Sequence, residues 1–238
     1  MRNKTKGLTL VEGLIVLVVL FIVVGLLMPS IRTARNPARQ SMCRNNLRQV
    51  SLALLNYEKA NGTLPPAYSV DESGKRLHSW RTLILPYIES GSLHELIDFT
   101  KPWDDPANAK ARETPFPTYL CPSYPGEDET LTTYLAVVGP GCAFTGSEPR
   151  EFSGESERAA SLITVIDAPH ERAVHWMSPE DITPEEVLAF DEETKWQHVG
   201  VGLVAHFDGS CHSLPKDIDQ EELRAMLTLS VAELPETP

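Results

Sequence analysis

Histidine and carboxylate side chains near the C-terminus are the residues of this chain best suited to acid–base or metal chemistry. His198 is followed by nine residues and then Asp208-Gly209, in the stretch HVGVGLVAHFDGSCHSLP. A His and an Asp can serve a hydrolytic or cation site, but both types are also common at strand ends and in turns. The chain contains no G-x-S-x-G, G-x-G-x-x-G, P-loop or H-E-x-x-H motif. We therefore expect no catalytic residues and no enzymatic activity.

A metal site shared by the last two histidines is disfavoured by the expected strand register. Asp208-Gly209 is a strong signal for a two-residue hairpin turn. Such a turn pairs His206 with Cys211 and places His206 and His212 on opposite faces of the hairpin. We therefore expect no metal bound between them.

Calcium is the one cofactor for which the sequence offers candidate ligands. Asp208, Asp217 and Asp219 are conceivable oxygen donors close together in the chain. Their spacing does not match an EF-hand loop. We accordingly expect no cofactor, with structural calcium as the alternative.

The four cysteines are widely spaced and form no C-x-x-C pair, which disfavours a zinc ribbon or a thioredoxin-like site. They allow either two disulfides, if the domain is exported, or buried thiols. If disulfides form, the first expected pair joins Cys43, on an apolar helix stripe, to Cys121, at the end of an expected strand. Cys142 and Cys211 would form the other pair.

The elements that position these residues begin with an apolar N-terminal segment. Residues 8–30 are apolar almost throughout and contain one carboxylate, Glu12. As a helix, these residues would be about 34 Å long, enough to cross a hydrocarbon core of about 30 Å. We therefore expect a membrane-spanning helix.

The sequence K-G-L-T-L-V-E at residues 6–12, followed by the apolar run, resembles the leader of type IV prepilins and type II secretion pseudopilins. The resemblance implies that residues 1–7 are a leader and that a prepilin peptidase cuts after Gly7 and methylates Leu8. It also implies that Glu12 is needed for assembly with other pilin-like subunits through the N-terminal helix. Leu8 departs from the Phe that is commoner at this position.

The charge distribution bears on partners and orientation. Residues 1–50 carry eight Arg or Lys side chains against one Glu, a formal charge of +7. Since the whole chain has a net charge of −12, residues 51–238 carry −19. An acidic domain gives no reason to expect nucleic-acid binding. The leader resemblance places the domain outside the cytoplasm, anchored in the inner membrane. A positive-inside count opposes this orientation, because five arginines follow the span: Arg32, Arg35, Arg39, Arg44 and Arg48.

The rest of the chain predicts a pilin-like α+β fold, with a long N-terminal helix packed on an antiparallel sheet among short helices and long loops. Residues 31–61 continue the helix with an apolar stripe formed by Cys43, Leu47, Val50, Leu54 and Tyr57. Residues 62–229 form the globular domain, which ends in a hairpin, and 230–238 form a flexible tail. Strands are expected at 118–121, 132–138, 162–166 and 199–207, and a last helix within 217–229.

The His-x9-Asp-Gly motif of His198, Asp208 and Gly209 is similar to the tail of a prepilin-type family of unknown function. Further pieces of the chain resemble the same family, among them C-R-N-N-L-R-Q-V-S-L-A-L-L-N-Y at 43–57 and S-W-R-T-L-I-L-P-Y-I-E at 79–89. The resemblance implies a pilin-like fold and a membrane origin, but no established activity. We expect a non-catalytic, pseudopilin-like subunit of a pilus-like or type II-like secretion assembly. The alternative is a membrane-tethered solute-binding or hydrolytic domain that uses the helix only as an anchor.

Overall fold

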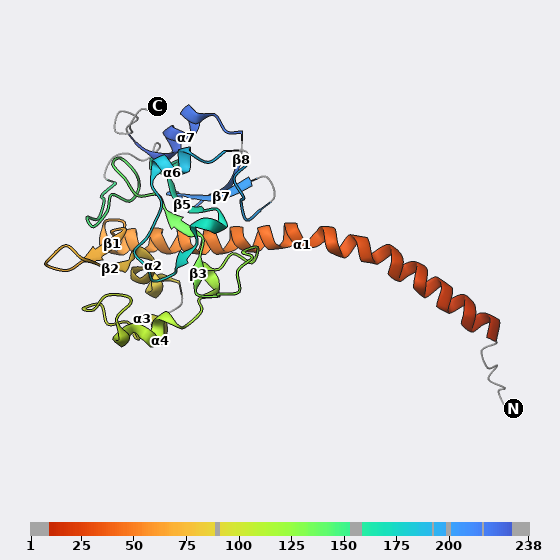
Figure 1. Cartoon of the computed structure of the whole chain (residues 1–238). Helices are drawn as coiled ribbons and strands as arrows, with labels where there is room; N and C mark the ends of the chain where they lie inside the picture. Colours follow the sequence, from red (N-terminus) through yellow and green to blue (C-terminus); the bar gives the residue numbers. More distant parts are fainter. Residues whose placement is uncertain are drawn as a thin grey trace. The chain divides into compact units, whose positions relative to one another are not determined.

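The computed structural model describes residues 10–88, 91–152, 159–191, 193–198, 201–215 and 217–229, with the backbone alone for 24–35. The chain divides into two compact units, Met1–Arg39 and Gln40–Pro238. The first contains only the beginning of helix α1 among its described residues. The second contains every other helix and strand described here (Figure 1).

Helix α1, Leu10–Asn61, supplies the long helix that the sequence predicts. In the second unit, Cys43, Leu47, Val50 and Leu54 of the predicted stripe are buried, and Tyr57 packs against the same core. Their spacing of three and four residues places them on one side of the helix. The predicted stripe is therefore confirmed.

The helix ends where the sequence predicts its end. Gly62 has a positive φ of 81° and its N–H donates to the carbonyl of Glu58. The following Pro65 and Pro66 cannot continue a helix. Local sequence is thus sufficient to terminate α1.

The main sheet has four antiparallel strands in the order β4-β5-β7-β8. The strands are β4 Tyr134–Ala136, β5 Ile163–Asp167, β7 Val201–His206 and β8 Cys211–Pro215. These strands and the helices give an α+β fold with antiparallel sheets, as predicted.

The two faces of the sheet belong to different layers of the unit. Leu203 and Ala205 of β7 lie in the same apolar cluster as Leu47 and Val50 of α1. Val204 points to the other face and joins a second cluster with residues of α6 Pro184–Leu188 and α7 Gln220–Leu227. Alternate strand residues therefore pack on α1 and on the α6–α7 layer. Figure 1 shows β5 and β7 between α1 and these two helices.

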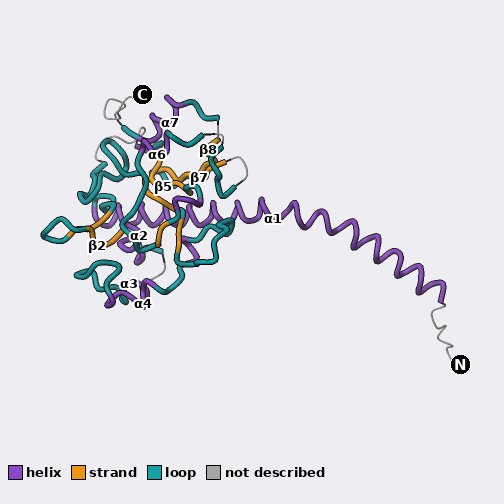
Figure 2. The backbone as a smooth tube through the Cα atoms, viewed as in Figure 1, coloured by secondary structure: helices purple, strands orange, loops and turns teal. Residues whose placement is uncertain are grey.

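Short elements joined by loops complete the second unit (Figure 2). Two small antiparallel pairs are β1–β2 and β3–β6. The bounds of the remaining elements are β1 Tyr68–Val70, β2 Arg76–Ser79, α2 Trp80–Leu83, η1 Leu85–Tyr87, α3 Gly91–His94, η2 Pro106–Asn108, α4 Ala109–Arg112, η3 Pro117–Tyr119, β3 Leu131–Thr132, η4 His170–Arg172 and β6 Val174–His175.

Two predicted strands differ from the structure. The expected strand at 118–121 is largely replaced by the 3₁₀ turn η3, because Pro117 sets its first residue and the N–H of Leu120 bonds to the carbonyl of Pro117. The expected strand at 132–138 is divided between β3 and β4, which belong to different sheets. The strand expected at 162–166 is found as β5, and the one expected at 199–207 is found as β7 from Val201 to His206, with residues 199 and 200 outside the described ones.

The register of the C-terminal hairpin also differs from the prediction. Ala205 pairs with Cys211 and Val204 with His212, one residue away from the predicted pairing. The N–H of Gly209 bonds to the carbonyl of His206, and Gly209 has a φ of +86°. These features define a three-residue loop with glycine in the left-handed region in place of a two-residue turn.

No helix in the described part of the chain combines the length and apolar character needed to cross a membrane. The predicted span at 8–30 begins with two residues that lie outside the described ones, and its side chains from 24 to 30 are not described either. The structure therefore does not confirm that prediction.

Candidate functional site

The residues predicted for processing lie at the start of the chain. Gly7 and Leu8 are outside the described residues, so the predicted cleavage position stays a prediction. Glu12 lies in the first turn of α1 and is exposed. A carboxylate is favourable in a first turn because it interacts with the positive end of the helix dipole.

The His-x9-Asp-Gly motif spans strand β7, with His198 before its start and Asp208-Gly209 just beyond its end. At the first end of the motif, His198 is buried, with 5% of its surface exposed. At the other end, Asp208 and Gly209 form part of the loop that leads to β8. Because β7 separates the two ends, His198 and Asp208 serve different sites.

The Asp-Gly end of the motif packs against α1. A Cβ atom on Gly209 would lie 2.9 Å from Cδ1 of Leu55, and φ is already in a region that favours glycine. Asp208 accepts a hydrogen bond from the N–H of Ser210 at 2.8 Å. Ser51 of α1 donates to the carbonyl of His206 at 3.1 Å. These contacts give the Asp-Gly pair a structural role.

The histidines that were predicted to point apart lie on the same face. The rings of His206 and His212 have centroids 5.2 Å apart. The reason is the one-residue register change, which makes His212 the cross-strand partner of Val204, a same-face neighbour of His206. Burial lowers the pKa of His206, and His212 lowers it further, while a hydrogen bond with the carbonyl of Ser161 raises it.

The His end of the motif lies in a cluster of four buried side chains. Cys43, Cys121, Asp167 and His198 come from α1, the segment after η3, the end of β5 and the segment before β7. Each offers one ligand atom, and these four atoms lie within 4.8 Å of one another. Asn46 of α1 helps to position Cys121 by donating to the nearby carbonyls of Pro117 and Leu120. Local sequence pattern did not predict this cluster.

Cys43 and Cys121 are joined by a disulfide, with their Cα atoms 5.2 Å apart. This confirms the first predicted pair. The second predicted pair is wrong, because Cys142 and Cys211 remain thiols. Cys142 belongs to the apolar cluster on the α6–α7 side of the sheet, whereas Cys211 packs against the cluster on the α1 side. The sheet therefore lies between them.

His198 has polar neighbours on both ring nitrogens. Nε2 lies 3.5 Å from Oδ2 of Asp167 and 3.6 Å from Sγ of Cys121. Nδ1 lies 3.5 Å from Oγ of Ser123. Ser123, His198 and Asp167 thus follow the order of a hydrolytic triad, but both separations exceed the 2.6–3.2 Å typical of one. Ser123 also lacks a nucleophile-elbow motif.

Asp167 is the member of the cluster that sequence analysis missed. Asp167 is 1% exposed, and burial raises the pKa of its carboxyl although its interactions with His198 and Thr133 lower it. Oδ1 accepts from Thr133 at 2.5 Å, whereas the polar neighbour of Oδ2 is Nε2 of His198, at the long separation of 3.5 Å. The available signal was a carboxylate at the end of a strand of buried apolar residues, which requires a specific partner.

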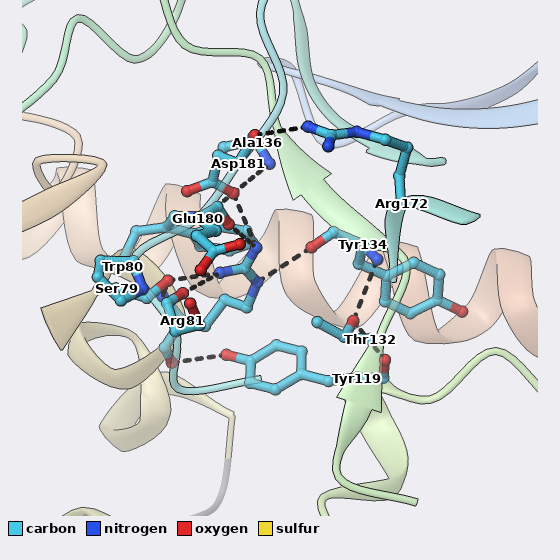
Figure 3. Close-up of polar contacts among 12 residues, drawn as sticks. Ser79, Trp80, Arg81, Tyr119, Thr132, Tyr134, Ala136, Arg172, Glu180 and Asp181 are labelled. Carbon is cyan, nitrogen blue, oxygen red and sulfur yellow. Dashed lines mark hydrogen bonds and ion pairs between the residues drawn. The ribbon is translucent and has the colours of Figure 1, made fainter. Parts of the chain in front are cut away.

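A second buried polar centre surrounds Arg81, whose side chain is fully buried. Nη2 forms an ion pair with Oδ1 of Asp181 at 2.8 Å and donates to the carbonyl of Glu180. The other three N–H groups bond to Ser79 Oγ, the carbonyl of Ser178 and the carbonyl of Tyr134. Figure 3 shows how this guanidinium joins α2 to β4 and to the segment before α6.

Asp181 is itself held by groups other than Arg81. Its Oδ1 accepts from the indole N–H of Trp80 at 3.0 Å and from the backbone N–H of Ala136 at 2.8 Å. Burial raises the pKa of Asp181, and the charge of Arg81 lowers it. Since every N–H of Arg81 is used and the pair is buried, the centre holds elements together.

A surface cavity of about 420 Å³ lies beside the Asp-Gly loop. Arg44 and Arg48 of α1 line one side of it, and Asp208, Cys211 and His212 line the other. Arg44 donates to Ser213 Oγ at 2.9 Å, which links helix and hairpin across it. Two cationic side chains make the cavity suited to a small anion.

Asp208, Asp217 and Asp219 were the conceivable ligands of the calcium alternative, whereas the prediction itself was no cofactor. Asp208 accepts from Ser210, and Asp219 caps α7 by accepting from the N–H groups of Glu221 and Glu222. Both carboxylates thus have local structural partners, as is usual for Asp in turns and N-caps. Within the described residues, the cluster with metal-ligand geometry is the buried one around His198.

Comparison with known proteins gives a family but no activity. No curated protein and no solved structure matches the chain. A family model described as "Protein of unknown function (DUF1559)" matches residues 32–164. The match includes Cys43 and Cys121 and lies outside both the predicted leader and the His-x9-Asp-Gly motif. Because it covers more than half of the sequence, the chain belongs to the DUF1559 family of proteins of unknown function.

Proposed function

We propose that this chain is a prepilin-like, membrane-anchored subunit that acts without catalysis of its own in a pilus-like or type II-like secretion assembly. The observation that carries the proposal is the K-G-L-T-L-V-E sequence at 6–12, followed by an apolar segment. A long helix that starts in this segment and continues into the core of an α+β unit supports it.

The exposed side chains of the first helical turns support contacts with other subunits. Leu10 is 89% and Phe21 75% exposed, and the large apolar side chains between them are exposed as well. A helix that is apolar on all sides is stable when other helices or lipid cover it. In the proposed assembly, the same segment of neighbouring subunits provides that cover. The new α-amino group of Leu8 on a neighbour would pair with Glu12 and set the axial register.

The disulfide supports a location of the second unit outside the cytoplasm. Disulfides form and persist in oxidising compartments and are rare in the cytosol. Cys43–Cys121 links α1 to the segment after η3 across 78 positions of sequence. The proposed location is the inner membrane, with residues after the span displayed outside the cytoplasm.

The test of processing is the intact mass of the full-length chain co-expressed with a prepilin peptidase. We expect the loss of residues 1–7 and a methylated Leu8 at the new N-terminus. The Gly7→Val variant should keep its full mass, because the bulky side chain blocks cleavage. Wild-type protein that still begins with Met1 in the presence of active peptidase would refute the proposal.

The role of Glu12 is tested by crosslinking the processed subunit in membranes. Glu12→Ala should be cleaved normally but should lose crosslinks between copies, because its carboxylate no longer pairs with the neighbouring amine. Glu58→Ala, which alters an acidic residue near the other end of α1, is the matched control and should keep those crosslinks. Equal crosslinking of wild type and Glu12→Ala would contradict assembly through this residue.

Solute binding is a second candidate function, favoured by the cavity beside the Asp-Gly loop. Its two arginines suit an anionic solute, and inorganic phosphate is the simplest probe. If this function holds, phosphate raises the melting temperature of the full-length protein and Arg48→Ala removes the rise. Lys59→Ala, a change on the same helix away from the cavity lining, should keep it.

A further inference from the structure

The four buried side chains around His198 have the composition of a metal centre. They supply two sulfur atoms, one imidazole nitrogen and one carboxylate oxygen. Cysteine, histidine and aspartate are the three residue types that most often bind zinc. Each residue comes from a different segment, so the cluster is a product of the tertiary fold.

Two separations in the cluster fit the edges of a tetrahedral zinc site. Zinc bonds of about 2.0–2.3 Å place neighbouring ligand atoms about 3.3–3.8 Å apart. Nε2 of His198 lies 3.6 Å from Cys121 Sγ and 3.5 Å from Asp167 Oδ2, which are two edges of such a tetrahedron. The four ligand atoms lie within 4.8 Å of one another, so the remaining separations need changes of about 1 Å or less to shorten to such an edge.

The unused oxygen of Asp167 points to the same conclusion. Oδ2 is buried and has only the long 3.5 Å contact with His198 Nε2 among the described residues, too long for an ordinary hydrogen bond, while Oδ1 is held by Thr133. A buried carboxylate oxygen without a hydrogen bond is costly unless a cation is near it. Thr133 holds the carboxylate with this oxygen directed at His198, as an outer-shell partner of a metal ligand does.

The oxidation state of the two cysteines decides whether an ion can bind. In the disulfide, both sulfur atoms are used in the covalent bond between them. A dithiol reductant supplies two electrons and two protons, which breaks the S–S bond, gives two thiols and leaves the reductant as a disulfide. Zinc then displaces the two thiol protons to solvent and binds both thiolates.

We propose that, when reduced, Cys43 and Cys121 bind one zinc ion together with His198 and Asp167. The four ligands complete a tetrahedron and are all buried, so the site is structural and has no open position for a substrate. The ion would link α1 to the same segment that the disulfide links. The chain thus has two exchangeable crosslinks, a disulfide under oxidising conditions and zinc under reducing ones.

The test uses the full-length protein in two states, oxidised and reduced with a phosphine that does not bind zinc strongly. Elemental analysis after removal of excess metal should give one zinc per reduced chain and none per oxidised chain. Cobalt added to the reduced protein should produce a near-ultraviolet charge-transfer band from its thiolate ligands. Zinc should abolish this band by displacing cobalt.

Variants distinguish the proposed ligands from the other cysteines. His198→Gln and Asp167→Asn should each weaken zinc binding by at least tenfold, because each removes one ligand. The double variant Cys142→Ser/Cys211→Ser should keep the cobalt band, since neither residue belongs to the cluster. Circular dichroism checks the fold of each variant.

Three results would overturn the proposal. The first is a folded, reduced chain that shows no thiolate band with cobalt. The second is a band that disappears in Cys142→Ser/Cys211→Ser. The third is a reduced chain that is unfolded and does not refold when zinc is added. None of these results depends on cleavage after Gly7, so the zinc site and the proposed assembly function can fail separately.

Discussion

Arg81 shows how a single charged residue can organise an interior. Its guanidinium bonds to five acceptors from separate parts of the second unit, and its charge is balanced by Asp181. The Arg side chain is suited to this role because its five N–H groups lie in a fixed plane. A buried pair of this kind adds little net stability over an apolar one, but either partner alone is costly.

Removing the positive charge should therefore destabilise the protein strongly. Arg81→Met leaves Asp181 buried without its counter-ion, and we expect the free energy of unfolding to fall by about 3–5 kcal/mol. Urea denaturation followed by circular dichroism measures the change. Lys110→Met is the control, because Lys110 is exposed and replacing it should change the free energy of unfolding by about 0.5 kcal/mol or less.

A second substitution tests the electrostatic explanation. Asp181→Asn keeps an oxygen for the N–H groups of Trp80 and Ala136 but removes the negative charge. The double variant Arg81→Met/Asp181→Asn should be more stable than Arg81→Met alone. A double variant that is less stable by the full sum of the single effects would show that the charge itself is unimportant.

At the scale of elements, the loop between β7 and β8 fixes the relation of the hairpin to α1. Gly209 combines a left-handed φ with a close approach to Leu55. Ser51 adds a hydrogen bond to the carbonyl of His206. The Asp-Gly half of the motif is thus explained by turn geometry and helix packing.

Gly209→Ala should cost more stability than a similar change in an open turn. Gly74 has nearly the same φ, +83°, but a Cβ atom there would meet nothing within 4 Å. Gly74→Ala therefore reports the backbone strain alone, about 1–2 kcal/mol. Gly209→Ala should lose this amount plus the cost of moving Leu55, as measured by urea denaturation. Equal losses in the two variants would show that the contact with α1 is unimportant.

At the scale of the whole molecule, burial favours the neutral form of several histidines. Burial lowers the pKa of His78, His175 and His206. Their folded pKa values therefore lie below the unfolded value of about 6.5, so the unfolded chain binds more protons below that pH. Stability from these groups is fully present above pH 6.5 and is lost as the pH falls through the folded values.

The free energy of unfolding should accordingly decrease when the pH is lowered from about 7 to 5.5, by at most about 1.4 kcal/mol per pH unit for each group. His206→Gln should reduce the slope, because it removes one buried titrating ring. Denaturation curves at several pH values measure it, with His170→Gln, at a partly exposed position, as the control. Asp167 and Asp181 act in the opposite sense at lower pH, because burial raises the pKa of both carboxyls. If His206→Gln shows the same dependence of the free energy of unfolding on pH as wild type, His206 does not contribute to that dependence.

Local patterns in the sequence predicted much of this fold. The stripe from Cys43 to Leu54 follows from the helix period and is found, and the strand expected at 199–207 is found over Val201–His206. The Cys43–Cys121 pair was also predicted, because Cys43 lies on the apolar stripe of the helix and Cys121 ends an expected strand that should pack against that stripe. These features depend on side chains that are neighbours in one element or that share one apolar face.

Tertiary structure alone decided the register of the hairpin and the composition of the cluster around His198. The loop has one residue more than predicted, which shifts every cross-strand pair by one and places His206 and His212 on the same face. The close packing of Gly209 against Leu55 of α1 favours this longer loop. Asp167 and His198 are 31 positions apart, and Cys43 is farther still, so no local period could bring them together. Only the folding of α1, β5 and the segment before β7 around one core places their ligand atoms within 4.8 Å.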